Sequence, residues 1–205
     1  MLDKSVPYHA LVMRADAADV ARAALPALPE GYAFRMYRPG DRAAWAAIET
    51  SVAEFSTEAN ALQYFDRVFL PEEPLMRQRC CFIVSPDGTP VATATAWYEQ
   101  LGGTRRALFH WLAVCPRHQG MGLGRAVAAR ALNTFARTEP GADVWLHTQT
   151  WSHKAVGMYL RMGFHPLKTD PLNPGYDSFA PSLPVFRSVL PEKTWLQFLD
   201  MTEDR

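Results

Sequence analysis

Residues 111–125 read Trp-Leu-Ala-Val-Cys-Pro-Arg-His-Gln-Gly-Met-Gly-Leu-Gly-Arg, and this stretch carries the strongest information about the fold. An apolar run leads into a turn that contains Gly120, Gly122 and Gly124, and an alanine-rich segment follows at once. Glycine lets the backbone adopt positive φ angles and approach a ligand closely. The N–H groups and the positive dipole end of a new helix favour an anion. The stretch therefore predicts a buried strand, a phosphate-binding turn and a helix.

The spacing of these glycines excludes two common phosphate-binding motifs. A dinucleotide fingerprint, G-x-G-x-x-G, would need glycine at position 125 or 127, where the chain has Arg125 and Val127. A P-loop would need Gly-Lys-Ser or Gly-Lys-Thr at the start of the helix, and this too is absent. An ordinary strand–helix turn remains as the alternative to a binding motif.

Two motifs carry a resemblance to a known family. Gln119, Gly122 and Gly124 match the acetyl-CoA signature (Gln or Arg)-x-x-Gly-x-(Gly or Ala) of the GCN5-related N-acetyltransferase (GNAT) superfamily. Many such enzymes also carry a later helix of the form Asn-x-x-Ala-x-x-x-Tyr-x-x-x-Gly-Phe. This chain has that spacing in Ser152, Ala155, Tyr159, Gly163 and Phe164, with serine in place of asparagine. The chain thus resembles the superfamily over about Arg106–Pro166.

Outward from this region, hydrophobic patterns and turn residues predict the remaining elements. Helices are expected after Asp41 as a cap, after Ser56 or Thr57, from the glycine turn to about Arg137, over about His153–Met162 and over Thr194–Leu199. Strands are expected at Tyr32–Tyr37, Arg79–Ser85, Val91–Tyr98, Arg106–Val114, Asp143–Thr148, from Phe164, and at Val185–Leu190. This order predicts a mixed α/β (α+β) domain with a central mixed, mainly antiparallel sheet flanked by helices, the fold that the resemblance also implies.

The domain organisation predicted from these patterns has three parts. Residues 1–31, with an apolar run at His9–Met13 and a weak helix, are expected to be an N-terminal extension. Residues 32–190 are the expected acetyltransferase domain, and 191–205 a short C-terminal helix or tail.

Composition limits the functional classes. The 205 residues are 48% hydrophobic, enough for a core, and 21 basic residues balance 21 acidic ones. That balance argues against a protein that binds nucleic acid through bulk charge. Cys80, Cys81 and Cys115 form no disulfide framework. No stretch has the length and apolarity of a membrane span or a signal peptide, so a cytoplasmic enzyme without a membrane partner is expected.

The resemblance implies acetyl-CoA as the cosubstrate, with no metal. In similar enzymes the strand before the turn binds pantetheine through its backbone and supplies an oxyanion hole, here at Leu112, Ala113 and Val114. The N–H groups of the turn hold the pyrophosphate. The cofactor contacts beyond the strand are then expected at Gln119, Gly120, Met121, Gly122, Leu123, Gly124, Arg125, Ser152, Ala155 and Tyr159.

Acetyl transfer to an amine needs a proton acceptor and a proton donor. Tyr159 occupies the position of the tyrosine acid in similar enzymes, or it packs in the core. His110 is the candidate base, because an ordinary histidine pKa near 6.5 suits proton uptake. Glu99 competes for that role, directly or through water, and neither residue is needed if the amine arrives neutral. Cys115 and His118 lack a second pair at zinc spacing. His147 and His153 are expected in solvated positions or on the acceptor side.

The acceptor is expected to be a primary amine of a small molecule or peptide. The region also resembles mycothiol synthase-like acetyltransferases, which does not assign a substrate. Acceptor choice is expected to lie in the first two helices and the loop Thr169–Pro184. A non-catalytic acyl-CoA sensor and a transferase for longer acyl chains are the alternatives. A homodimer agrees with the resemblance, since dimers are common among similar enzymes.

Overall fold

The computed structural model describes residues 2–170, 172–173 and 178–204. The chain divides into two compact units, the first comprising residues 24–97 and 109–138, and the second 2–23, 98–108 and 139–205. Two long strands, β4 (Pro90–Leu101) and β5 (Thr104–Val114), contribute residues to both units. Helices and mainly antiparallel strands occur in each unit, so the mixed α/β class predicted from the sequence is confirmed.

Strands in the first unit follow the order β2-β3-β4-β5. β2 (Ala33–Met36) is antiparallel to β3 (Cys80–Val84), which is antiparallel to β4. The hairpin between β3 and β4 lies where the sequence predicts it: the N–H of Ser85 donates to the carbonyl of Thr89 at 2.9 Å, and Gly88 has a φ of 83°. The predicted strands of this unit are therefore confirmed, and most of their ends agree with the prediction to within two residues.

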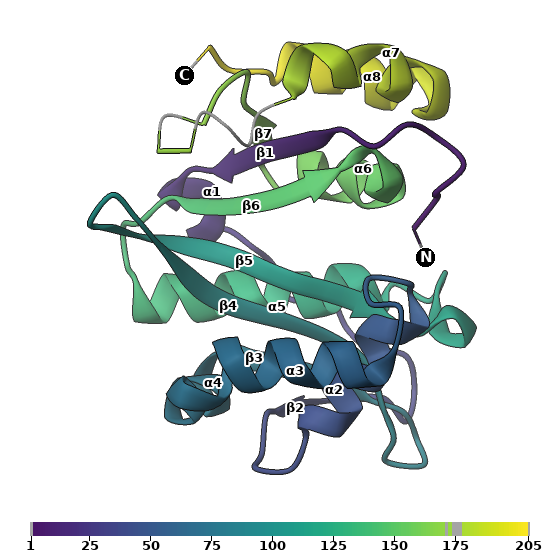
Figure 1. Ribbon diagram of the computed structural model, residues 1–205, viewed down its shortest axis with the longest axis vertical. Coiled ribbons are helices and arrows are strands. Elements are labelled where there is room, and N and C mark those ends of the chain that lie inside the picture. Colours follow the sequence, from purple (N-terminus) through teal and green to yellow (C-terminus); the bar gives the residue numbers. More distant parts are fainter. Residues whose placement is uncertain (1, 171, 174–177, 205) are drawn as a thin grey trace. The chain divides into compact units, whose positions relative to one another are not determined.

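Helices α2 (Arg42–Ser51) and α3 (Glu58–Val68) pack side by side in the first unit (Figure 1). The helix predicted after Ser56 or Thr57 begins after Thr57, whose hydroxyl caps it by accepting the N–H of Asn60 at 3.2 Å. Asp41 precedes α2, but its carboxylate makes no cap bond to the helix and instead binds the Arg35 guanidinium and accepts the N–H of Arg38 at 2.6 Å. Asp41 therefore occupies the predicted N-cap position of α2, but without a side-chain cap bond.

Further helical segments of the first unit include α5 (Leu123–Thr138), the 3-10 helix η1 (Leu70–Glu72) and α4 (Glu73–Arg79). α5 packs against β3 and agrees with the helix predicted after the glycine turn. η1 and α4 were not predicted. α4 buries only Met76 and Arg79, so it has no amphipathic pattern that the sequence could reveal.

In the second unit the strand order is β5-β6-β1-β7. β1 (Ala10–Ala15) is antiparallel to both β6 (Val144–Gln149) and β7 (Phe164–Pro166), and all six of its residues are buried. This strand lies inside the segment 1–31 that the sequence suggests as an extension. The domain boundaries at 31 and 190 stay predictions.

The α-helices of the second unit, among the described residues, are α1 (Ala17–Ala21), α6 (His153–Arg161), α7 (Phe179–Val189) and α8 (Glu192–Asp200), and a 3-10 helix, η3 (Thr150–Ser152), precedes α6. α6 and α8 agree with the sequence prediction. The strand predicted at Val185–Leu190 is wrong, because most of this run belongs to α7. Phe179, Ser182, Val185 and Phe186 are buried at helical spacing, and this pattern overrides the local apolar run.

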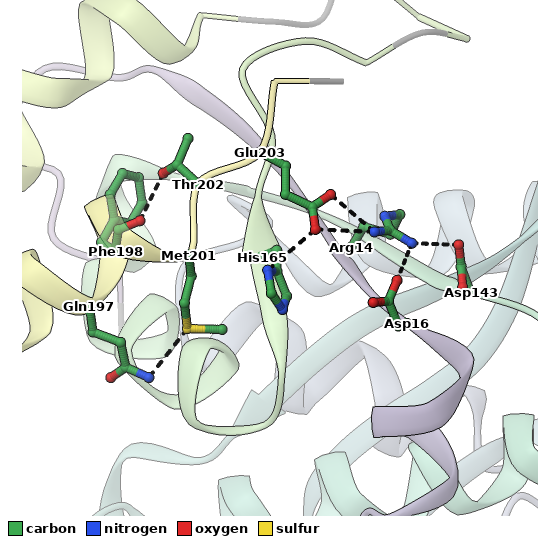
Figure 2. A network of polar contacts seen from close by, with 9 residues as sticks. All are labelled: Arg14, Asp16, Asp143, His165, Gln197, Phe198, Met201, Thr202 and Glu203. Atoms are coloured by element: carbon green, nitrogen blue, oxygen red, sulfur yellow. Dashed lines mark hydrogen bonds and ion pairs between the residues drawn. The ribbon is translucent and has the colours of Figure 1, made fainter.

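A buried arginine ties β1 to the end of the chain (Figure 2). Arg14 is 1% exposed and forms ion pairs with Asp16, with Asp143 at 2.5 Å and with Glu203 at 3.0 Å. His165 Nδ1 lies 3.3 Å from the same Glu203 carboxylate. Three carboxylates thus surround one guanidinium, which fixes the C-terminal residues on the second unit.

No helix of the described residues is long and apolar enough to cross a membrane. The three cysteines are free, as expected from the sequence, and burial raises the pKa of Cys80 to about 11 and that of Cys81 to about 12.

Candidate functional site

The glycine turn connects β5 to α5 through a short 3-10 helix, η2 (Pro116–His118). Gly120 and Gly122 have φ angles of 79° and 80°, and among the described residues no atom other than those of the adjacent residues in the chain lies within 4 Å of where a side chain would begin at either position. The first helical bond of α5 runs from the Ala126 N–H to the Gly122 carbonyl at 3.1 Å. The earlier N–H groups of a helix have no intrahelical acceptor and favour an anion.

Gln119 braces the turn against the end of β5. Its side-chain amide Nε2 donates to the carbonyl of Val114 at 2.8 Å. The N–H of Cys115 donates to the carbonyl of Val91 at 2.8 Å, which anchors the same point to β4. These bonds fix the backbone from β5 into the turn, as a preorganised binding loop requires.

Tyr32 adds a contact to the turn that the sequence did not reveal. Its hydroxyl is hydrogen-bonded to Nδ1 of His118 at 2.9 Å and lies 3.8 Å from Sδ of Met121. Tyr32 precedes β2 and is far from the turn in sequence, so no local motif links them. Among the predicted contact residues, Met121 is 41% exposed, Arg125 is exposed, and Ala113 is buried.

His110 lies on β5 beside an aromatic cluster of the same unit. Nε2 of His110 is 3.0 Å from the hydroxyl of Tyr64 on α3. The His110 ring also packs edge-on against Phe69 and Trp111, with centroid distances of 6.0 and 5.2 Å. Trp111, the next residue of β5, has a φ of 51°, which is strained for a residue other than glycine. Strain of this kind is typical of functional positions.

Glu49 is the unusual titratable group near this cluster. Its side chain comes from α2 and is 0% exposed, and neither carboxylate oxygen has a hydrogen-bond partner among the described residues. Burial raises the pKa of Glu49 well above the ordinary glutamate value. The indole Nε1 of Trp111 is likewise buried without a described partner. Buried polar groups normally find a hydrogen-bond partner.

Tyr159, Ser152 and Ala155 belong to the second unit. Tyr159 lies on α6, is 7% exposed and packs edge-on against Phe164 with centroids 5.9 Å apart. Ser152 occupies the N-cap position before α6, but its hydroxyl makes no cap bond to the helix. The structure therefore gives Tyr159 a packing role, and its acid role stays a prediction.

Glu99 forms a buried ion pair in the second unit. Its carboxylate accepts from Nε of Arg106, whose side chain is 5% exposed. Arg106 also binds both carboxylate oxygens of Asp170, at 2.8 and 2.6 Å, and lies over the Trp145 ring at 4.3 Å. His147 Nε2 lies 3.2 Å from Arg106. Glu99 thus neutralises a buried guanidinium, which is a structural role.

The expectation of solvated positions for His147 and His153 is wrong. Burial lowers the pKa of His147, and His153 Nε2 lies 3.3 Å from the carboxylate of Asp3. No group of three or more His, Cys, Asp or Glu side chains in the described part of the chain is placed to hold a metal ion. Of the loop Thr169–Pro184, residues 171 and 174–177 lie outside the described residues, and its last residues belong to α7.

Comparisons with known proteins agree with this arrangement. The chain is 30% identical over 146 residues to a mycothiol acetyltransferase of Streptomyces griseus, covering 71% of this chain and 47% of the relative. It is 31% identical over 144 residues to a mycothiol acetyltransferase of Salinispora tropica, covering 68% of this chain and 46% of the relative. The chain therefore spans about half the length of these relatives.

Solved structures show the same fold at lower identity. A GCN5-related N-acetyltransferase from Sphaerobacter thermophilus matches with a TM-score of 0.59 and 19% identity, over 78% of this chain and 48% of that one. A tandem GNAT protein from the clavulanic acid biosynthesis pathway matches with a TM-score of 0.56 and 19% identity, over 80% of this chain and 52% of that one. Residues 44–164, more than half of the chain and including the glycine turn, match the acetyltransferase (GNAT) family. The chain belongs to the acetyltransferase (GNAT) family.

Proposed function

We propose that this chain is an N-acetyltransferase that moves the acetyl group of acetyl-CoA to a primary amine of a small molecule or peptide. The observation that carries the proposal is the glycine turn, in which Gly120 and Gly122 keep positive φ angles and open space at the start of a 16-residue helix. Membership of the family supports acetyl-CoA as the ligand of this turn. The names of the relatives support acetyl transfer as the reaction.

The residues of the turn fit a diphosphate-bearing ligand. A side chain at Gly120 or Gly122 would occupy space that is open in the structure, and the backbone would be strained. We propose that the N–H groups from Gln119 to Arg125 bind the pyrophosphate of acetyl-CoA, and that the backbone of Leu112–Val114 binds pantetheine. Ser152, Ala155 and Tyr159 of the second unit are the further proposed contacts.

Acetyl-CoA, when bound, supplies an acetyl group activated as a thioester. A primary amine has a pKa of about 10 and is mostly protonated at neutral pH. In the proposed mechanism His110 takes one proton from the ammonium group, which leaves a neutral amine with a free electron pair. A backbone N–H in Leu112–Val114 stabilises the negative charge that develops on the carbonyl oxygen.

Tyr159 is the proposed acid for the second proton movement. The new C–N bond forms as the C–S bond breaks, and Tyr159 gives its phenolic proton to the leaving sulfur. The proton that the amide nitrogen loses restores the phenol. His110 returns its proton to solvent, so both residues are ready for the next turnover.

His110 is a better base candidate than Glu99. His110 is half-buried beside the half-buried rings of Tyr64 and Trp111, and Trp111 is a strained residue. Glu99 is held by the buried guanidinium of Arg106. Without the Glu99 carboxylate, the buried Arg106 guanidinium would lose one of its countercharges. The ion pair therefore gives Glu99 a structural role.

The direct test is amine-dependent release of CoA thiol. The protein is incubated with acetyl-CoA and, in separate reactions, an arylalkylamine, an amino sugar and a peptide with a free N-terminus, and products are identified by mass spectrometry. The proposal predicts thiol release with an acetylated product for at least one amine class. Acetyl-CoA binding with no transfer to any class would contradict the catalytic role and favour a binding module.

A further inference from the structure

The contact between Tyr64 and His110 joins two segments that are distant in sequence. Tyr64 lies on α3 and His110 on β5, and the phenol oxygen is 3.0 Å from Nε2. Both side chains are half-buried. The Tyr64 ring is also in edge-on contact with Trp111, with centroids 5.0 Å apart, so the phenol is fixed by packing as well as by the hydrogen bond. A side chain locked in this way can orient its partner.

The chemistry of the phenol suits this contact. Burial raises the pKa of Tyr64 above the ordinary tyrosine value, so the side chain keeps its proton at neutral pH. A neutral phenol can donate to an unprotonated ring nitrogen or accept from a ring N–H. Among the described residues, the other charged groups that act on this phenol are Arg67, whose guanidinium lies 5.7 Å from the Tyr64 ring centroid, and the buried Glu49 of α2.

We propose that Tyr64 is a positioning residue that holds His110 in the orientation from which it takes the proton of the acceptor ammonium. When the imidazole gains that proton, both of its nitrogens carry N–H groups, and the Nε2–H donates to the Tyr64 oxygen. The proton moves from the ammonium nitrogen to the ring, and Tyr64 neither gains nor loses one. This inference rests on the proposed function, since it assigns Tyr64 a role through His110.

Tyr64→Phe tests the role because it removes the hydroxyl and keeps the ring. We expect kcat to fall about tenfold, while the KM values for acetyl-CoA and the amine change less than about twofold. The acidic limb of the kcat/KM profile should move to lower pH, because the protonated ring loses a hydrogen-bond acceptor. A purely structural role would change stability without moving the limb.

Tyr37→Phe is the matched control in the same unit. Tyr37 is 3% exposed and its hydroxyl donates to Glu73 at 3.1 Å, so this variant also loses a buried tyrosine hydrogen bond. Its pH profile should match that of the wild type. A Tyr64→Phe profile that also matches the wild type, in a folded protein, would overturn the proposal.

Measuring Tyr64→Phe in a protein that also carries His110→Gln separates this inference from the proposed function. In a His110→Gln protein, Tyr64→Phe should lower kcat by less than about twofold further, because the residue through which it acts is gone. Equal effects of Tyr64→Phe with and without His110 would overturn the positioning role alone. A His110→Gln protein with wild-type rates would instead reject His110 as the base.

Imidazole ¹⁵N NMR of the wild type gives a result even if Tyr64→Phe does not fold. The His110 signals are assigned by their loss in His110→Gln. We expect Nε2 of His110 to show the shift of a hydrogen-bonded nitrogen and one tautomer to dominate above the transition. Averaged nitrogen shifts typical of a solvated imidazole would contradict the positioning role.

Discussion

The guanidinium of Arg106 binds both carboxylate oxygens of Asp170, at 2.8 and 2.6 Å, and thereby fixes the start of the segment after β7 to β5. Asp170 is 0% exposed, and the N–H of Leu172 also donates to it at 3.0 Å. Burial alone would raise the pKa of Asp170, but its hydrogen bonds with Arg106 and Leu172 hold that pKa below the ordinary value of 3.8. A buried pair of this kind depends on both partners.

Asp170→Asn is expected to lower the free energy of unfolding by about 3 kcal/mol at pH 7, because a buried guanidinium loses one of its countercharges. The pair stabilises the fold above pH 3.8, and this contribution is lost as the pH falls through the lower folded pKa. Urea denaturation from pH 3 to 7 measures both effects. The control is Glu192→Gln, which breaks the exposed pair with Arg187 and should cost less than about 0.5 kcal/mol.

Gly122→Ala is expected to weaken acetyl-CoA binding at least tenfold, since a side chain at a φ of 80° strains the backbone that would approach the pyrophosphate. Gly88→Ala is the matched control in the hairpin of the same unit, with a φ of 83° and equally open space. Both variants should lose about 1 kcal/mol of stability. Equal acetyl-CoA affinity of the two would argue against the turn as the binding loop.

His110→Gln and Glu99→Gln distinguish the two candidate bases. His110→Gln should lower kcat about a hundredfold near neutral pH and remove the acidic limb of the profile. Glu99→Gln should lower the melting temperature, because Arg106 loses an ion-pair partner, and should keep that limb. If Glu99→Gln removed the acidic limb of the pH profile and His110→Gln kept it, Glu99 would be the base.

Tyr159→Phe is expected to lower kcat about a hundredfold with little change in the KM for the amine, because the leaving sulfur loses its proton donor. Tyr8→Phe removes the hydroxyl of a 51% exposed tyrosine in the same unit and should leave kcat unchanged. A Tyr159→Phe protein of wild-type rate would contradict the acid role of Tyr159.

Glu49→Gln is expected to raise the free energy of unfolding at pH 8 by about 1–3 kcal/mol. Burial raises the folded-state pKa of Glu49 well above 4.5, so the folded protein binds more protons than the unfolded chain above that pH. Stability therefore falls as the pH rises past 4.5 in the wild type. The variant should show a smaller difference between pH 5 and pH 8, and an unchanged difference would mean that Glu49 ionises normally.

The sequence was most informative where the determinants are local. The glycine turn, the Thr57 cap and the hairpin at residues 86–89 follow from a few neighbouring residues, and the structure contains all three. Val185–Leu190 was mistaken for a strand because a short apolar run fits both a strand and a buried helix. The helix choice depends on Phe179 and Ser182, which lie outside that run.

The contacts of the candidate site were not predictable from spacing. Tyr64 meets His110, Tyr32 meets His118 and Glu99 meets Arg106 only after strands and helices have packed. The second motif identified Tyr159 as a candidate, and His110 was chosen for its histidine chemistry on the strand before the turn. No sequence pattern indicated that Glu99 is held by a buried arginine or that Tyr64 binds the candidate base. Such partners follow from tertiary packing, which single-sequence patterns do not encode.

The most direct test of the account is a calorimetric titration of the protein with acetyl-CoA, with NAD and ATP as control ligands that also carry pyrophosphate groups. The account predicts binding of acetyl-CoA with a Kd in roughly the micromolar range and at least tenfold weaker binding of both controls. No binding of acetyl-CoA, or equal binding of all three ligands, would contradict the acetyltransferase proposal.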